Sequence, residues 1–255
     1  MPDQFSRTCL MLGKENMQRL QHARVAVFGI GGVGGYVVEG LVRSGIGTFD
    51  LIDHDQICLS NLNRQIIATR KTIGKYKVDV AKERILEINP EASVNIYKIF
   101  FLPDTADQFD FTQYDYVVDA IDTVSGKLEL IQQAMRCNIP VISAMGAGNK
   151  MDASALQVGD ISETTVCPLA RVMRRELKKR GIYHLKVVYS TEKPVEPKEI
   201  LGEGRDDGDD QENGCQWEDK KENTGRKRPP GSNAFVPSAA GLIIAGEIVK
   251  DLTIW

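Results

Sequence analysis

A glycine-rich segment, Gly29-Ile30-Gly31-Gly32-Val33-Gly34, has the composition of a turn that binds phosphate. It follows an apolar run at 25–28 and precedes a helical pattern at 36–44, which Gly45 ends. Because glycine has no Cβ, backbone N–H groups and the helix N-terminus can approach an anion closely there. Asp53 follows about 20 residues later, where a carboxylate can accept both hydroxyls of a ribose. Together these residues predict an adenosine nucleotide site; a tight turn that serves only packing is the alternative for the glycines.

The residues after Asp53 distinguish ATP from NAD. A nicotinamide site needs a flat pocket with little positive charge, whereas a reacting triphosphate needs hydrogen-bond donors and cations around its oxygens. Five polar or charged side chains follow in order: Asp55, Ser60, Asn61, Arg64 and Lys77. Asn61, Arg64 and Lys77 supply such donors and cations, so we expect ATP. Taken alone, Lys77 would be a solvated lysine near the start of a helix.

Two carboxylates, Asp119 and Asp122, end a further apolar run. A hard carboxylate beside a nucleotide is the usual ligand of Mg²⁺, and we assign this role to Asp122. Asp119 is expected to cap or stabilise the loop instead. Because the glycine turn, Asp53, Asp122 and residues 143–146 all follow predicted parallel strands, they should meet at one edge of the sheet.

Strand and helix patterns alternate along most of the chain. This alternation predicts an α/β fold with a doubly wound, mostly parallel, Rossmann-like sheet and a C-terminal elaboration. We expect strands at 25–28, 49–53, 93–99, 114–119, 140–144, 154–158 and 185–189, and helices at 36–44, 75–88, 124–138, 168–180 and 239–252.

The whole chain, 1–255, is predicted to be a single domain. Residues 1–23 form an N-terminal helical segment, 24–150 the nucleotide-binding core, and 151–200 with 231–255 an elaboration on the substrate side. Residues 201–230 are strongly charged and contain few apolar side chains, so they are expected to be a mobile inserted loop.

Composition excludes several other classes of protein. A net charge of -3 argues against a generally basic nucleic-acid coat. The start of the chain has no signal-peptide pattern and no apolar run could span a bilayer, so we expect a cytoplasmic protein without a membrane partner. The five cysteines are widely spaced without a Cys-x-x-Cys pair, which suits reduced thiols and predicts no zinc site.

These motifs resemble a known superfamily. Five elements are similar to the motifs of the adenylating proteins MoeB and ThiF and of the ubiquitin-activating enzymes. They are Gly29-x-Gly-Gly-x-Gly34, Asp53-x-Asp55, Ser60-Asn61-x-x-Arg64-Gln65, Lys77 and Asp122. Within this superfamily, three segments resemble those of the tRNA threonylcarbamoyladenosine dehydratases. They are Asn63-Arg64-Gln65-Ile66, Asp119-Ala120-Ile121-Asp122 and Pro168-Leu169-Ala170. The resemblance covers nearly the whole chain except 201–230.

The resemblance implies a reaction and roles for residues. ATP would adenylate the threonyl carboxylate of threonylcarbamoyladenosine next to the tRNA anticodon, and an internal nucleophile would then displace AMP and close a ring with net loss of water. Asp53 would hold the ribose, and Asp122 would hold Mg²⁺. The phosphates would be bound by Asn61, Arg64 and Lys77. Arg7 resembles an arginine that reaches the ATP of the neighbouring subunit, which implies a homodimer. A sulfur-relay protein of a cysteine desulfurase is a further partner that the resemblance leaves open.

The predicted helix after Pro168 is rich in cations. Arg171, Arg174, Arg175 and Lys178 could contact tRNA phosphates, with a solvated basic face as the alternative. Other functions also stay open. They are an adenylating enzyme for a sulfur-carrier or ubiquitin-like protein, a catalytically silent nucleotide-binding subunit and an NAD-dependent dehydrogenase.

Overall fold

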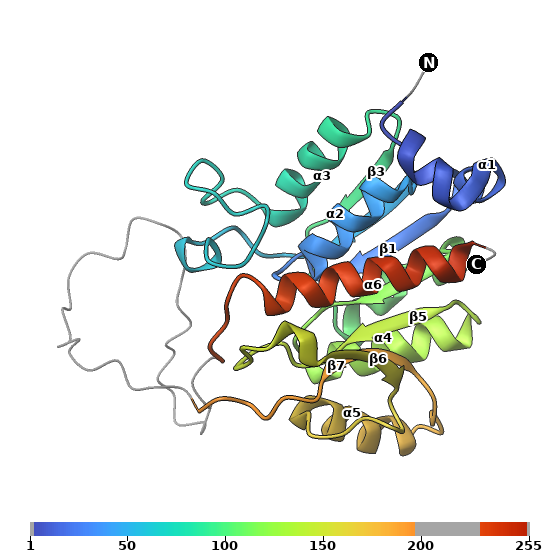
Figure 1. Cartoon of the computed structure of the whole chain (residues 1–255). Coiled ribbons are helices and arrows are strands. Elements are labelled where there is room, and N and C mark those ends of the chain that lie inside the picture. The colour runs from blue at the N-terminus through green and yellow to red at the C-terminus, as the bar shows by residue number, and fades with distance from the viewer. Residues whose placement is uncertain (1–2, 197–229, 254–255) are drawn as a thin grey trace.

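The fold is built on one seven-stranded sheet covered by helices on both faces (Figure 1). The structure is a computed structural model that describes residues 3–196 and 230–253. The strand order is β3-β2-β1-β4-β5-β7-β6, and all neighbouring strands are parallel except β6, which is antiparallel to β7. The predicted doubly wound, mostly parallel sheet is therefore confirmed. The predicted loop at 201–230 lies outside the described residues except for Pro230.

The bounds of the elements follow the predicted patterns closely. The helices are α1 (Ser6–His22), α2 (Gly34–Ser44), α3 (Lys77–Ile88), α4 (Val124–Arg136), α5 (Pro168–Lys178) and α6 (Val236–Leu252). The strands are β1 (Arg24–Phe28), β2 (Thr48–Ile52), β3 (Ser93–Tyr97), β4 (Tyr116–Asp119), β5 (Val141–Ala144), β6 (Leu156–Asp160) and β7 (Lys186–Ser190). Four short 3₁₀ helices are η1 (Leu59–Asn61), η2 (Pro103–Gln108), η3 (Phe111–Gln113) and η4 (Ala153–Ala155).

Each face of the sheet has its own hydrophobic core. Val25 and Val27 of β1 contact the core under α2, α3 and α6, whereas Ala26 and Phe28 contact the core under α4 and α5. This follows from the alternation of side chains along a strand, and it explains why the central strands are apolar at most positions. Because helices cover both faces of the sheet, a ligand can reach the sheet only at its two ends.

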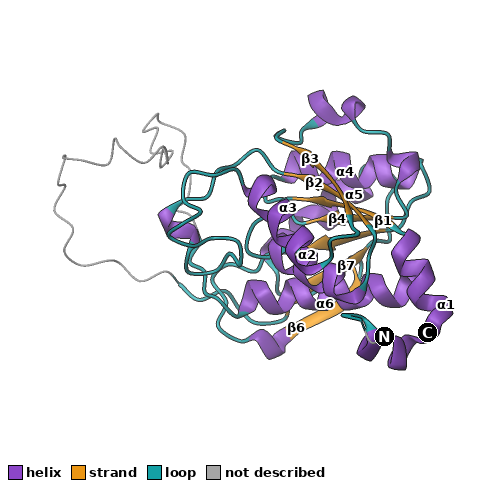
Figure 2. Ribbon diagram, turned by 90° about the horizontal axis from the view of Figure 1, so that it is seen from above, coloured by secondary structure: helices purple, strands orange, loops and turns teal. Residues whose placement is uncertain are grey.

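The two ends of the sheet differ in character. The strands β1, β2, β4 and β5 all run toward the end where the long loops gather, and α1 lies at the opposite end (Figure 2). Gly13 interrupts α1 with a φ of 79°, so the predicted N-terminal helical segment consists of two helical pieces joined by a kink. No helix among the described residues is long and apolar enough to cross a membrane.

Candidate active site

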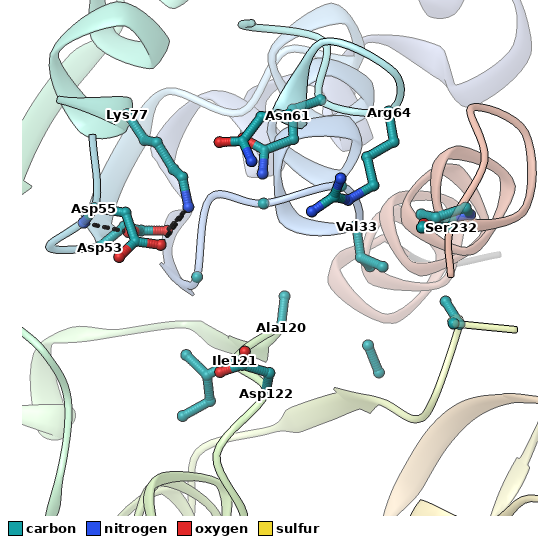
Figure 3. A pocket seen from close by; sticks show the side chains of 18 of the residues that line it. Val33, Asp53, Asp55, Asn61, Arg64, Lys77, Ala120, Ile121, Asp122 and Ser232 are labelled. Carbon is teal, nitrogen blue, oxygen red and sulfur yellow. Dashed lines mark hydrogen bonds and ion pairs between the residues drawn. The ribbon is translucent and has the colours of Figure 1, made fainter. Parts of the chain in front are cut away.

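A cavity of about 1390 Å³ opens at the carboxyl ends of the strands, between the loops that follow β1, β2, β4 and β5 (Figure 3). Most of the residues predicted for the nucleotide site line it. They are Gly29, Gly31, Gly32, Asp53, Asp55, Asn61, Arg64, Lys77 and Asp122. Two predicted residues, Gly34 and Ser60, do not line the cavity. The structure thus brings together motifs that are spread over nearly one hundred residues of sequence.

The glycines of the turn divide into two kinds. Gly29 has a φ of 89°, and a Cβ there would lie 2.6 Å from the carbonyl oxygen of Ala120. A Cβ on Gly34 would lie 1.8 Å from the carbonyl oxygen of Gly29, so packing alone requires glycine at both positions. At Gly31, by contrast, a Cβ would have no atom within 4 Å. Packing therefore explains the outer glycines of the motif but not Gly31, which faces open space.

The backbone of the turn offers unused donors to the cavity. The N–H groups of Gly31 and Gly32 donate to no described residue, and α2 begins immediately afterwards without a side-chain cap. Free N–H groups at a helix N-terminus attract anions through both hydrogen bonding and the helix dipole. The turn therefore fits a phosphate group.

The carboxylate of Asp53 is held rigidly at the end of β2. One oxygen accepts the N–H of Ile30 at 2.7 Å, and the other accepts the N–H of Asp55 at 2.8 Å. The ammonium of Lys77, which is buried, lies 2.5 Å from Asp55 and 3.8 Å from Asp53. A carboxylate has about four lone-pair directions, so Asp53 keeps the capacity to accept hydroxyl groups of a ligand.

Arg64 is a half-buried cation without a counter-ion among the described carboxylates. Its guanidinium donates to the carbonyl of Ser60 and to the side-chain oxygen of Asn63, both at 2.9 Å. Burial lowers the pKa of Arg64, because removal from water disfavours the charged form. The stem of Arg64 packs over Gly32, where an added Cβ would be 3.4 Å from it. An uncompensated guanidinium beside the glycine turn favours an anionic ligand.

The two aspartates after β4 have different surroundings. Asp119 is fully buried and is bound by the Lys127 ammonium at 3.0 Å and the Ser143 hydroxyl at 2.5 Å. Asp119 was expected to cap or stabilise the loop, but these contacts instead join the end of β4 to α4 and β5. Asp122 is exposed on the cavity wall and points into it (Figure 3).

The donor set at Asp122 suits Mg²⁺, which binds through one or two carboxylates together with substrate phosphates. A second acidic group exists nearby, because the ligand atoms of Asp53, His54 and Asp55 lie within 4.8 Å of one another. However, the Lys77 ammonium already neutralises part of that charge at 2.5 Å from Asp55. Asp122 is therefore the better candidate for a metal ligand.

Two groups of predicted residues lie away from the cavity. Arg7 is exposed on α1, at the far end of the sheet (Figure 1), so it cannot reach the cavity of its own chain. On α5, Arg171, Arg175 and Lys178 are exposed. Arg174 is half-buried and donates to the backbone and hydroxyl oxygens of Thr164 at 2.7 and 2.8 Å, so it has a structural role there.

Several lining residues were not predicted. Ile99, Phe100 and Phe101 form an apolar wall after β3, and the ring of His54 lies 4.5 Å from that of Phe100. Their position at the end of the strand next to β2 was the available signal. Gln65 is also buried in the wall, and its side-chain oxygen has no hydrogen-bond partner among the described residues. Its place beside Arg64 in the sequence motif was the signal for it.

Three of the cysteines match the expectation of reduced thiols. Cys9, Cys137 and Cys167 are free thiols. Cys58 lies on the cavity wall, and Cys215 lies outside the described residues.

Fold and cavity together define a Rossmann-like α/β protein with an anion-binding site where the strand order reverses, between β1 and β4. The family model of the ThiF family matches residues 5–253, so the chain belongs to the ThiF family. The family resemblance deduced from the motifs is thereby confirmed.

Several similar proteins are tRNA threonylcarbamoyladenosine dehydratases. The chain is 42% identical over 252 residues to the tRNA threonylcarbamoyladenosine dehydratase of Bacillus subtilis (strain 168), covering 98% of this chain and 94% of the relative. It is 40% identical over 201 residues to the dehydratase of Escherichia coli (strain K12), covering 76% and 75%. The crystal structure of the E. coli enzyme in complex with ATP superimposes with a TM-score of 0.82 at 33% identity, covering 98% and 93%.

Proposed function

We propose that this protein is an ATP-dependent tRNA threonylcarbamoyladenosine dehydratase. The observation that carries the proposal is that an open glycine turn, the uncompensated cation Arg64 and two carboxylates, Asp53 and Asp122, line the same cavity. Similarity to dehydratases over almost the full chain supports the same substrate. The related enzyme whose structure contains ATP supports the nucleotide.

The nucleotide is placed by the chemistry of the wall. Asp53 accepts the ribose hydroxyls, and the apolar wall at 99–101 lies beside it, on the β3 side of the cavity, where it can cover an adenine ring. The phosphates lie against Gly31 and Gly32, with Asn61, Arg64 and Lys77 as donors and cations around them. Asp55 orients the Lys77 ammonium. Gly34 acts indirectly, because it allows the tight packing of the turn. Ser60 also acts indirectly, because its carbonyl accepts a hydrogen bond from Arg64 and fixes the guanidinium.

Mg²⁺, held by Asp122, would neutralise charge on the phosphates when bound. The chain's own residues supply the remaining stabilisation: Arg64 and the turn amides contact oxygens whose negative charge grows as the α-phosphorus is attacked. Because these donors are fixed before the reaction, little reorganisation is needed at that moment.

The reaction has two covalent steps. An oxygen of the threonyl carboxylate bonds to the α-phosphorus of ATP, and pyrophosphate leaves. An internal nucleophile of the threonylcarbamoyl group then attacks the activated carbonyl carbon and AMP leaves with the carboxylate oxygen, while the proton of the nucleophile is lost to solvent. A carboxylate is a poor electrophile, and AMP gives it a leaving group. The net result for the nucleoside is the loss of one water.

Two further proposals concern partners. We place the tRNA backbone on Arg171, Arg175 and Lys178 of α5, which are exposed, and we leave Arg174 out because Thr164 occupies its guanidinium. Arg7 acts from the neighbouring subunit of a homodimer, because its own cavity is at the opposite end of the sheet.

The test is nucleoside mass spectrometry of tRNA that carries threonylcarbamoyladenosine. The tRNA is incubated with the protein, with and without Mg-ATP, and then digested under conditions that preserve the cyclic product. We expect a product lighter by one water only when protein and ATP are both present. Pyrophosphate release that needs a protein ending in Gly-Gly, and not tRNA, would establish the alternative of a carrier-protein adenylating enzyme.

A further inference from the structure

The cavity has two parts of different chemistry. Among the described residues, the Asp, His, Arg and Lys side chains of its wall all come from the segments that follow β2 and β4 or from the start of α3. They are Asp53, His54, Asp55, Arg64, Lys77 and Asp122. A second part of the wall has no charged side chain and consists of residues 144–148 at the end of β5, Leu169, Pro230, Ser232 and Pro237. We call this second part the neutral half.

The size of the cavity leaves room for a second reactant. Pockets for small molecules usually measure about 300–1,000 Å³. The volume here is about 1390 Å³, which exceeds that range. The sheet order also separates the neutral half from most of the charged residues. Asp53, His54, Asp55 and Arg64 follow β2, whereas residues 144–148 lie at the end of β5, and β1 and β4 lie between these two strands.

The wall of the neutral half is fixed by hydrogen bonds. Asn149 and Gly231 are joined in both directions, by a backbone bond of 2.7 Å and by a bond of 2.6 Å from the N–H of Gly231 to the Asn149 side chain. The Asn233 side chain donates to the carbonyl of Lys150 at 2.6 Å. The Lys150 ammonium is itself buried and donates to the carbonyl of Glu192, so this cation is already engaged by the protein.

We propose that the neutral half is the acceptor subsite and that it takes the uncharged body of an amino acid linked to a nucleobase. The inference rests on the proposed function, which it deepens by assigning the acceptor to named residues. The carboxylate of such a molecule points toward Arg64 and the glycine turn, where positive charge lies, while its amide and hydroxyl groups occupy the part without cations. A phosphate in the neutral half would lose its hydration without gaining a counter-ion.

Helix α5 links this subsite to the exposed basic face. Leu169 lies in the first turn of α5 and in the cavity wall, whereas Arg171, Arg175 and Lys178 follow on the same helix. At 1.5 Å per residue, Lys178 is about 14 Å along the axis from Leu169. A nucleotide turned out of its RNA strand into the neutral half would therefore leave its neighbouring phosphates beside α5.

A matched pair of variants at Leu169 tests the subsite. Leu169→Glu places a negative charge in the neutral half, in the same cavity that the carboxylate of the acceptor enters, whereas Leu169→Gln has the same size without charge. A glutamate in the first turn is favoured by the helix dipole, so the fold should tolerate it. We expect Leu169→Glu to raise the KM for the modified tRNA about tenfold or more, because like charges repel. The KM for ATP should change less than about twofold, and Leu169→Gln should raise the KM for the modified tRNA much less than Leu169→Glu does.

A second pair separates filling of the subsite from general damage. Ala147→Leu narrows the neutral half, and Ala153→Leu adds the same atoms to a half-buried alanine that does not line the cavity. Binding of free threonylcarbamoyladenosine, measured by calorimetry with a non-hydrolysable ATP analogue present, should weaken about tenfold only in Ala147→Leu.

The outcomes distinguish this inference from the proposed function. Wild-type protein that forms no cyclised nucleoside refutes the proposed function before any variant is compared. An active wild type overturns only the acceptor subsite if Leu169→Glu leaves the KM for tRNA unchanged and Ala147→Leu leaves the affinity for free threonylcarbamoyladenosine unchanged. A rise in the KM for ATP alone would assign the neutral half to the nucleotide and would also overturn it.

Discussion

Substitution of two glycines in the turn should separate binding from folding. In Gly34→Ala the new Cβ would start 1.8 Å from the carbonyl oxygen of Gly29, and both partners are backbone. Contacts of this kind do not occur below about 3 Å, so the backbone must move by more than about 1 Å, at a cost of about 3 kcal/mol or more. For a domain of this size, that corresponds to a fall in Tm of about 6 to 12 °C.

In Gly31→Ala the new Cβ meets no atom within 4 Å. The free energy of unfolding should therefore change by less than about 1 kcal/mol, and a small gain is expected because alanine restricts the unfolded chain. If phosphate contacts the turn amides, the methyl group lies in its path and weakens at least one charged hydrogen bond. Such a bond is worth about 1.5–3 kcal/mol, so the Kd for ATP should rise at least about tenfold.

The assay is thermal unfolding together with calorimetric titration of Mg-ATP. Gly246→Ala is the control, because a Cβ at this position on α6 also meets no atom within 4 Å and Gly246 does not line the cavity. It should bind ATP like the wild type. Wild-type ATP affinity in Gly31→Ala would refute the placement of the phosphates against the turn, and an undiminished Tm in Gly34→Ala would refute the packing argument.

Three further predictions concern catalysis. Arg64→Ala should lower turnover about 10²- to 10³-fold, as loss of one preorganised donor does, and near-normal rates in a steady-state assay would contradict its role. Asp122→Asn should abolish Mg²⁺-dependent turnover while far-UV circular dichroism and Tm stay unchanged; a normal rate that still depends on Mg²⁺ would exclude the metal assignment. If Arg7 acts across a dimer, Arg7→Ala and Arg64→Ala should complement each other, because one site of each mixed dimer is intact. Random mixing would restore about a quarter of wild-type activity, and no recovery from confirmed mixed dimers would refute action from the partner.

Much of the nucleotide-binding core was predictable because local patterns determine it. Apolar runs gave the central strands, and the left-handed conformation of Gly45, with a φ of 97°, ends α2 as its composition predicts. Asp53 and Asp122 were predictable as neighbours because carboxyl ends of parallel strands share one edge. The motif could not show that Gly31 and Gly34 have different reasons to be glycine, since that depends on which backbone atoms lie opposite.

The features that were missed depend on contacts between distant segments. The strand order places β7 between β5 and β6, although β6 comes first in the sequence, and periodicity carries no information about order. Arg174 resembled its cationic neighbours on α5 until the structure showed its guanidinium bonded to Thr164. Nothing in the spacing of Lys127 distinguished it from a solvated lysine, yet it is almost fully buried.

That buried lysine joins the two parts of the cavity. Its ammonium lies 3.0 Å from Asp119, the last residue of β4, and 2.8 Å from the carbonyl of Ala144, the last residue of β5. Asp122 follows β4, and residues 144–148 of the neutral half lie at the end of β5. The ion pair of Lys127 and Asp119 therefore sets the position of Asp122 relative to the neutral half. Buried ion pairs are often no better for stability than apolar replacements, which favours a positioning role.

Single and double variants of the pair can test this role. Lys127→Met alone leaves the Asp119 carboxylate without its counter-ion in the core and should cost about 3–5 kcal/mol of unfolding free energy. Adding Asp119→Asn removes the remaining charge with little change in shape, so most of that stability should return in a denaturant titration. If the pair positions the two reactants, the double variant is stable but turns over more slowly and has a raised KM for tRNA. Wild-type kinetics in the stable double variant would show that the ion pair contributes nothing to the alignment of acceptor and nucleotide.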